Sequence, residues 1–425
     1  MWSGVQTDVQ PFFVSTAIVQ ILKYNDTVLR LVIKRDNIVT GDRFELRKFV
    51  APEFVIGSDA RLLTGRYAKN FGARHVLVVT GPNIIREGWV RDVTASLNEE
   101  GIAHTVFSSV SPNPRDTEVM AGAAIYAESG CDSIVAVGGG SPMDCAKGIG
   151  IVSSNTKNIL EFEGVDRIAV PPPPVICIPT TAGTGADVSQ FAIINDTNRR
   201  VKIAIISKKI VPDIALIDPL PLTTLTPELT AYTGMDAITH SVEAYVSNAS
   251  SPVTDIHALE SIRLMQAHLL PACKNPKNTG HRYQTMLGSL CAGLAFSNAS
   301  LGAVHAMAHS LGGFSDLPHG ECNALLLEHV MAFNFPSCPG RYEAIGHAMG
   351  ADLSGLHSNE RKEKVIAGIR SLRETLGITE TLGDLGVTKE KIPTLARNAL
   401  QDPCMATNPR QPTAHDIERI YEEAL

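Results

Sequence analysis

Short apolar runs alternate with helical patterns between residues 46 and 219. The runs are rich in β-branched residues and almost continuously hydrophobic, which is typical of strands buried on both faces. They cover residues 75–80, 104–107, 133–137, 175–178 and 214–217. The alternation predicts a parallel sheet covered by helices, and therefore a Rossmann-like α/β domain.

A different pattern begins near Thr226, where a periodicity of about 3.6 residues replaces the strand signals. Its clearest stretches are residues 227–246, 252–270, 285–296 and 305–311. We expect this part of the chain to be all helical. A proline-rich segment at 218–222 separates the two patterns, so the predicted domains are an α/β domain at 46–219 and a helical domain at 220–425.

The first 45 residues fit neither domain. Apolar runs at 12–22 and 27–38 have strand character and flank the turn residues Asn25 and Asp26. Two interpretations stay open at this point. The segment is either a peripheral hairpin or a stretch that precedes the true start codon.

Composition narrows the class of protein. Of the 425 residues, 44% are hydrophobic and 19% are charged, as in a globular protein with a large core. The net charge of −7 disfavours nucleic acid or an anionic membrane as a partner, because both require a basic surface. The eight cysteines include no Cys-x-x-Cys pair, and we find neither a signal peptide nor an apolar run of about 18 residues. We therefore expect a cytoplasmic protein with reduced, mostly buried cysteines.

A glycine-rich loop directly follows the predicted strand 133–137. It consists of Gly138, Gly139, Gly140 and Ser141 and leads into a helical pattern. We expect Ser141 to cap that helix, with Asp144 completing a Ser-x-x-Asp capping pattern. Glycines allow the backbone to approach a phosphate, which the N–H groups at a helix N-terminus bind. The alternative is an ordinary tight strand–helix turn.

A second polar loop, residues 179–185, follows the predicted strand 175–178. Its threonine hydroxyls and glycines suit hydrogen bonds to a ribose or a phosphate. An ordinary βα loop would look similar. Two such loops at the carboxyl edge of one sheet favour a dinucleotide as the ligand.

The helical half carries the candidate metal ligands. Asp236 and His240 are four residues apart on one predicted helix, as are His305 and His309 on another, so each pair shares a helix face. His319 follows in a predicted loop after a glycine pair that we expect to end the second helix. Three imidazoles and one carboxylate suit Fe²⁺, Zn²⁺ or another first-row cation, which would act as a Lewis acid on a substrate oxygen. The spacing alone permits all five residues as ligands.

These motifs together resemble the iron-containing (group III) alcohol dehydrogenases, which include lactaldehyde reductases and butanol dehydrogenases. The resembling segments are the glycine loop with Asp144, residues 179–185, residues 233–245 and residues 302–320, and the resemblance extends over about residues 47–425. It implies a dinucleotide-binding α/β domain, a helical metal-binding domain and an active site in the cleft between them. The implied reaction is hydride transfer between a primary alcohol or diol and NAD or NADP, with Fe²⁺ or Zn²⁺ as the metal. A homo-oligomer is expected.

The resemblance also assigns roles to individual residues. The implied metal ligands are Asp236, His240, His305 and His319, and His309 is implied to lie near the nicotinamide and the substrate without binding the metal. Phe296 matches a residue that lines the substrate site. The implied cofactor contacts are Gly81, Asn113, Gly138, Gly139, Gly140, Ser141, Asp144, Thr180, Thr181, Gly183, Thr184 and Lys202.

One of these positions departs from the family pattern. Many NAD-using members have an aspartate directly after the first strand, where it binds the adenosine ribose, and this chain has Gly81. Two alternatives also remain at this stage. A glycerol dehydrogenase or a dehydroquinate synthase-like lyase would share the fold, and a non-catalytic metal-binding protein would share the histidine cluster.

Overall fold

The computed structural model describes residues 19–24, 28–33 and 46–425, in two separate units that divide after Arg47. In the first unit, strand β1 (Val19–Tyr24) pairs antiparallel with β2 (Val28–Ile33), with Val19 opposite Ile33. This pairing agrees with the predicted hairpin. The remaining predicted strand residues, 12–18, 27 and 34–38, lie outside the described residues.

Removing residues 1–45 is expected to leave metal content and turnover unchanged, because every candidate site residue belongs to the unit that begins at Lys48. Metal analysis and steady-state kinetics of the truncated protein test this. An inactive or insoluble truncation would mean that the segment supports the larger unit.

The second unit is built on a six-stranded parallel sheet in the order β3-β11-β8-β6-β4-β5. Its strands are β3 (Glu53–Ile56), β4 (His75–Thr80), β5 (Ala103–Phe107), β6 (Ser133–Gly138), β8 (Val175–Pro179) and β11 (Ile214–Ile217). Five of the six were predicted to within about a residue at each end, and the almost continuous burial of β4, β6, β8 and β11 explains the hydrophobicity of these four. β3 was missed because it is a short edge strand with exposed residues.

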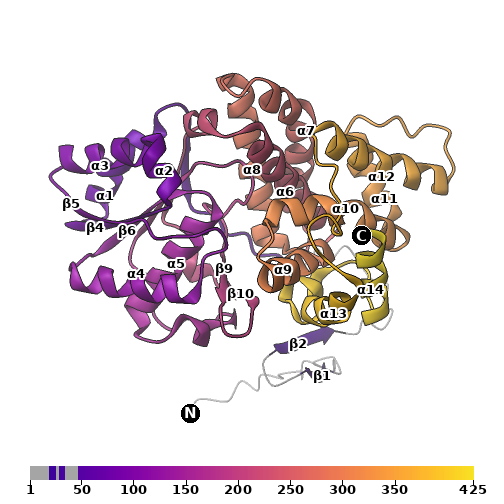
Figure 1. The fold of residues 1–425 in the computed structure, drawn as a ribbon, viewed down its shortest axis with the longest axis horizontal. Helices are drawn as coiled ribbons and strands as arrows, with labels where there is room; N and C mark the ends of the chain where they lie inside the picture. Colours follow the sequence, from indigo (N-terminus) through magenta and orange to yellow (C-terminus); the bar gives the residue numbers. More distant parts are fainter. Residues whose placement is uncertain (1–18, 25–27, 34–45) are drawn as a thin grey trace, which may run out of the picture. The chain divides into compact units, whose positions relative to one another are not determined.

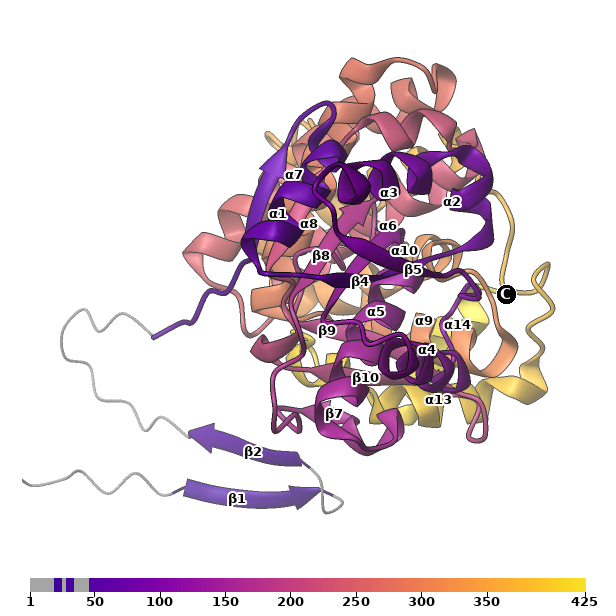
Figure 2. The same cartoon turned by 90° about the vertical axis from the view of Figure 1, so that its left-hand side faces the viewer.

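Helices cover both faces of this sheet, as predicted (Figure 2). One face packs against α1 (Thr64–Asn70) and α3 (Trp89–Glu99), with the short α2 (Pro82–Glu87) after β4. The other face packs against α4 (Asp116–Glu128) and α5 (Gly140–Asn155).

A three-stranded sheet beside the main sheet was not predicted. It consists of β7 (Gly164–Val165), β10 (Val201–Ile206) and β9 (Phe191–Asp196), and β9 and β10 form an antiparallel hairpin. Two apolar runs around the polar turn 197–200 are the signal in the sequence for this hairpin. The hairpin is important for the site, because Lys202 lies on β10.

The chain after residue 226 is helical, as predicted, and Figure 1 shows these helices beside the sheet domain. They are α6 (Pro227–Val246), α7 (Pro252–Lys274), α8 (Thr279–Ala299), α9 (Ala303–Ser315), α10 (His319–Asn334), α11 (Pro339–Ala348), α12 (Ser358–Thr375), α13 (Ile392–Gln401) and α14 (Ala414–Glu423). α6 begins where predicted because the Thr226 side chain accepts a hydrogen bond from Leu229 N and Pro227 occupies the first turn. The proline-rich segment between the halves forms a 3-10 helix at Leu220–Thr224.

The predicted break at Gly312 and Gly313 was wrong, because α9 continues through both residues to Ser315. Their small size has a different cause. A Cβ atom on Gly313 would lie 2.7 Å from the Val201 Cα atom, and one on Gly312 would lie 2.8 Å from Lys202 Nζ. The two glycines therefore let α9 pack closely against β10.

Taken singly, none of the helices in the described part of the chain combines the length and the apolar composition that a membrane span requires. The pair α8 and α9, bent by 99° at its junction, meets those two requirements only when both helices are counted together.

Candidate active site

The glycine loop lies at the point where the order of the sheet reverses, and the second polar loop follows β8, the strand beside β6. From β4 the chain continues to β5 on one side, and it then returns to β6 on the other side. Open α/β sheets bind ligands outside the carboxyl ends of the strands at such a switch point. Gly81 directly follows β4, and the glycine loop directly follows β6.

The loops pack tightly against each other, and this packing requires the glycines. Gly138 O accepts a hydrogen bond of 2.9 Å from Thr180 N. A Cβ atom on Gly139 would lie 3.0 Å from Thr181 Oγ1, and one on Gly140 would lie 2.8 Å from Thr184 Cγ2. A side chain at residue 139 or 140 would collide with the loop 179–185, which is sufficient reason for glycine at both positions.

The predicted cap at Ser141 was wrong. α5 begins at Gly140, its N-cap is Gly139, and no side chain caps it. Ser141 therefore lies inside the first turn, and Asp144 does not complete a capping pattern. An N-terminus without a side-chain cap leaves its first N–H groups directed at the space in front of the helix, where an anion can bind them.

One pocket, with an empty volume of about 780 Å³ that includes solvent at its mouth, extends along both halves of the chain. Its wall includes the cofactor candidates Asn113, Gly140, Ser141, Asp144, Thr184 and Lys202, together with all five ligand candidates of the helical half. The other cofactor candidates are not among its lining residues: Gly81, Gly138, Gly139, Thr180, Thr181 and Gly183. Of these, Thr180 has a buried hydroxyl without a hydrogen-bond partner.

Polar contacts connect the two halves at the mouth of the pocket. Asn113 Nδ2 donates a 2.9 Å hydrogen bond to Asp316 Oδ1, and Arg115 Nη2 lies 3.3 Å from Asp316 Oδ2. Asn113 has a φ of 55°, in the left-handed region that asparagine tolerates better than most residues. Lys202 is deeper, and burial lowers the pKa of its ammonium group.

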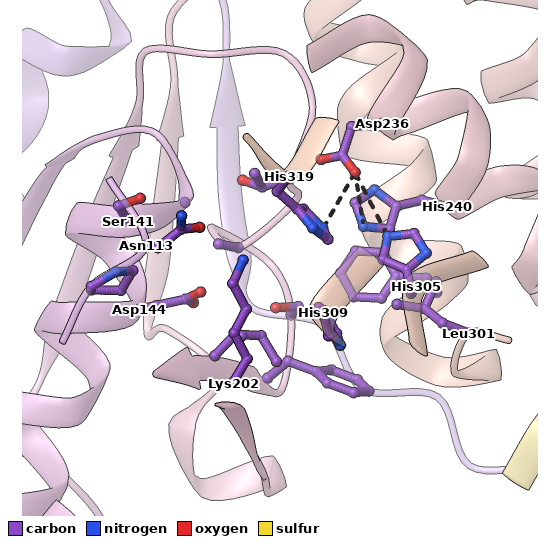
Figure 3. A pocket seen from close by; sticks show the side chains of 18 of the residues that line it. Asn113, Ser141, Asp144, Lys202, Asp236, His240, Leu301, His305, His309 and His319 are labelled. Carbon is purple, nitrogen blue, oxygen red and sulfur yellow. Dashed lines mark ion pairs between the residues drawn. The ribbon is translucent and has the colours of Figure 1, made fainter. Parts of the chain in front are cut away.

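The metal-ligand candidates converge at one end of the pocket (Figure 3). Asp236 Oδ1 lies 3.6 Å from His305 Nε2, 3.6 Å from His319 Nε2 and 3.9 Å from His240 Nε2. Asp236 and His240 lie on α6, and His305 lies on α9. His319 is the first residue of α10 rather than part of the predicted loop. The His240 and His305 rings stack with centroids 4.5 Å apart.

Asn323, which was not predicted, lies among these ligands. Its Nδ2 atom is 2.7 Å from Asp236 Oδ1 and 3.2 Å from the Nε2 atoms of both His305 and His319. Its Oδ1 atom is buried without a partner. Asn323 follows His319 by four residues on α10, so helical periodicity from a ligand would have pointed to it.

The charges of the cluster reinforce this convergence. Burial raises the pKa of a carboxyl, but the surrounding imidazoles hold the pKa of Asp236 well below its usual range. Burial lowers the pKa of His240 to about 3 and holds that of His319 well below its usual value. Burial alone would also lower the pKa of His305, but the carboxylates of Asp236 and Glu243 raise it to about 9.

This donor set fits a divalent cation. Asp236 Oδ1 and the Nε2 atoms of His305 and His319 all converge on Asn323 Nδ2, and the Oδ1 atom of Asn323 is buried without a partner. A buried carboxylate surrounded by three imidazoles, two of which, His240 and His319, burial keeps neutral, is the ligand chemistry that first-row metals prefer.

His309 belongs to a different group. Its Nδ1 atom lies 2.8 Å from Asp402 Oδ2, and the same carboxylate accepts a 2.8 Å hydrogen bond from Cys404 N. Burial opposes ionisation of Asp402, but His309 and the bonds to Cys404 keep the pKa of its carboxyl low. An ionised Asp402 accepts the Nδ1 proton, which leaves Nε2 as the ring nitrogen available to the pocket. Asp402 was not predicted, because 93 residues separate it from His309.

Phe296 contributes to the apolar wall of the pocket next to the ligand cluster. Its ring stacks on His240 with centroids 4.3 Å apart and lies against Phe191 at 5.7 Å. Phe191 and Leu301 line the same pocket. The wall is therefore apolar where it meets the candidate metal ligands.

Family models match most of the chain. Residues 51–219 match the model described as iron-containing alcohol dehydrogenase, and residues 230–425 match the C-terminal part of the Fe-containing alcohol dehydrogenase family. The sheet with its two loops lies in the first match, and all of the metal-ligand candidates lie in the second.

Individual proteins agree with these matches. The chain is 40% identical over 371 residues to the 1,3-propanediol dehydrogenase of Klebsiella pneumoniae, covering 87% of this chain and 96% of the relative. It is 36% identical over 377 residues to the NAD-dependent methanol dehydrogenase of Bacillus methanolicus, covering 89% and 99%. The crystal structure of a 1,3-propanediol oxidoreductase superposes with a TM-score of 0.87 at 38% identity, covering 90% of this chain and all of that one. The chain belongs to the iron-containing alcohol dehydrogenase family and is an oxidoreductase that acts on alcohols and aldehydes.

Proposed function

We propose that this protein transfers a hydride between a short primary alcohol or diol and a nicotinamide cofactor, NAD or NADP. The observation that carries the proposal is that one pocket has the glycine loop on one side and the Asp236 cluster on the other. A cofactor bound at the glycine loop and a substrate bound at the Asp236 cluster would meet inside this pocket. The NAD-dependent relative and the two propanediol relatives support the same reaction.

The proposed metal ligands are Asp236, His240, His305 and His319, and the family description favours iron as the ion. When bound, a divalent cation supplies Lewis-acid chemistry, which lowers the pKa of an alcohol and polarises a carbonyl oxygen. The residues of the chain hold it in place. Asp236 gives the set its anionic member, and the three imidazoles provide neutral nitrogen ligands.

The cofactor side relies on backbone donors. We propose that the N–H groups of Gly140 and Ser141, at the uncapped start of α5, bind the pyrophosphate. Thr184 and Asn113 line the pocket near this point and offer further hydrogen bonds. Lys202, also in the wall, adds a positive charge between the phosphates and the ligand cluster.

His309 is proposed as the proton-relay residue. Asp402 holds the Nδ1 proton, so Nε2 can accept the proton that an alcohol loses on oxidation or return it on reduction. Phe296, Phe191 and Leu301 exclude water from the place where the hydride moves.

Gly81 is proposed to relax the choice between the two cofactors, and Gly81→Asp should increase selectivity for NAD. A side chain fits, because its Cβ would be 3.7 Å from the nearest atom, Val110 O, and the φ of −101° suits any residue. Aspartate would accept hydrogen bonds from the ribose and repel a 2′-phosphate, by about 1 kcal/mol or more at ~4 Å, so the ratio of kcat/KM for NAD over NADP should rise about fivefold or more. An unchanged ratio would contradict the idea.

Two further points belong to this proposal. A cytoplasmic location is consistent with the reduced cysteines, and a homo-oligomer is consistent with the family. Cell fractionation tests the location, and analytical ultracentrifugation tests the oligomer.

An anaerobic screen of short alcohols and diols with NAD, NADP, Fe²⁺ and Zn²⁺ tests the function. Accumulation of reduced cofactor supports a dehydrogenase, whereas conversion of a substrate without it would support the lyase alternative.

A further inference from the structure

We propose that Glu243 is a positioning residue, whose carboxylate fixes the ring orientation and the tautomer of His305 so that Nε2 is ready to bind a divalent cation. The inference rests on the metal site proposed above and extends it by one residue outside the ligand set.

The contacts of Glu243 are short and all lie at the start of α9. Glu243 is 3% exposed, and its Oε2 atom lies 2.6 Å from His305 Nδ1. Its Oε1 atom accepts a 2.6 Å hydrogen bond from Val304 N. Each carboxylate oxygen therefore has a partner, and the two partners, Val304 and His305, are consecutive residues of one helix.

The same carboxylate replaces the missing cap of α9. The residue before this helix is Gly302, which has no side chain to cap it. A Cβ atom there would lie 2.7 Å from Asn408 Oδ1 and 2.9 Å from Glu243 Oε1, so the capping groups come from other elements. Asn408 accepts from Ala303 N and Glu243 from Val304 N. The negative charge of Glu243 also suits a helix N-terminus.

This arrangement determines which ring nitrogen of His305 is free. A carboxylate only accepts hydrogen bonds, so Nδ1 carries the proton, and in the neutral ring that metal binding requires, Nε2 carries the lone pair. Nε2 is the atom near Asp236 Oδ1, at 3.6 Å. A carboxylate on the far nitrogen of a histidine is the common means by which metal sites orient their ligands.

Glu243→Gln is the most informative variant. If its oxygen keeps the bond to Val304 N, its amide NH₂ group faces His305 Nδ1 and favours a proton on Nε2, which blocks ligation. If the amide turns around, its NH₂ group faces the Val304 N–H group, and two donors meet. Either arrangement weakens metal binding without removing a ligand.

The test is a titration of metal-free protein with Co²⁺ in competition with a chelator, followed through the visible absorption of the bound ion. Glu243→Gln should bind Co²⁺ about 10–100-fold more weakly than the wild type, with an altered spectrum. Saturating metal should restore much of the lost turnover. The matched control is Glu328→Gln, which removes a carboxylate of similar burial, 5% exposed, that pairs with Arg370 and Arg373. It should lose stability and keep its Co²⁺ affinity.

The outcomes separate this inference from the metal site itself. Wild-type affinity and spectrum in Glu243→Gln, or an equal loss in Glu328→Gln, would overturn the role of Glu243. Failure of the wild type to bind Co²⁺ would instead overturn the proposed metal site. Should Glu243→Gln not fold, nitrogen NMR of the metal-free wild type, at a pH where the His305 ring is neutral, still decides: a proton on Nδ1 agrees with the proposal, and a proton on Nε2 contradicts it.

Discussion

Loss of most bound metal and of nearly all turnover is the expected result of His240→Ala, His305→Ala and His319→Ala, each made separately. Replacing a residue that only orients a ligand costs about 10–100-fold in metal affinity, so removing a ligand should cost more than ~100-fold. Asp236→Ala should have a similar effect, because Asp236 is the carboxylate around which the three imidazoles gather. Metal analysis of each purified variant, alongside its kinetics, measures both quantities.

The control for these variants is His268→Ala. His268 and His281 form a second histidine pair, with Nδ1 atoms 3.1 Å apart, on α7 and α8. The pair is partly buried and lies outside the lining of the pocket. His268→Ala should keep its metal and its turnover, and if it loses metal as the other variants do, the losses in the cluster would not identify ligands.

A second large effect is expected for His309→Ala, this time on turnover and not on metal binding. This variant should keep its metal and lose about 10²–10⁴-fold in kcat, the contribution of a positioned acid–base group. The distinction follows from the geometry, because His309 Nδ1 bonds to Asp402 whereas the other imidazoles surround Asp236. A catalytic metal also needs an open position for substrate, which a fifth protein ligand would occupy.

The same metal analysis and kinetics test this prediction, with Asp402→Asn as the companion variant. Asp402→Asn should also keep its metal and reduce kcat, since an amide no longer holds the His309 proton on Nδ1. If His309→Ala loses its metal while His305→Ala retains it, the two histidines on α9 have been assigned in reverse.

The parts of the fold that follow from local sequence could be predicted. The four inner strands β4, β6, β8 and β11 are recognisable because burial on both faces makes them almost entirely apolar, and α6 is recognisable because Thr226 and Pro227 define its start. Errors arose where packing overrides a local rule. Gly312 and Gly313 interrupt nothing, because they make room for β10, and Ser141 does not cap α5, because the helix already starts at Gly140.

The candidate site divides in the same way. Asp236 with His240, and His305 with His309, could be found because helical spacing puts each pair on one face. Nothing in the sequence separates His305 from His309, because their different partners, Glu243 and Asp402, come from distant segments and meet them only in the folded protein. Helical spacing in the sequence reveals residues that are neighbours on one helix, and tertiary packing decides which of them lie in the same metal site.

A single-turnover experiment with an alcohol deuterated at its reacting carbon tests the central claim most directly. Metal-loaded protein is mixed anaerobically with NAD⁺ and 1,1,3,3-tetradeuterated propane-1,3-diol, and the reduced cofactor is analysed by mass spectrometry. The account predicts one deuterium on the nicotinamide ring, with product formed only by the metal-loaded protein and not by His305→Ala. Reduced cofactor that lacks deuterium, or equal product from the metal-free protein, would contradict direct hydride transfer beside a metal held at Asp236.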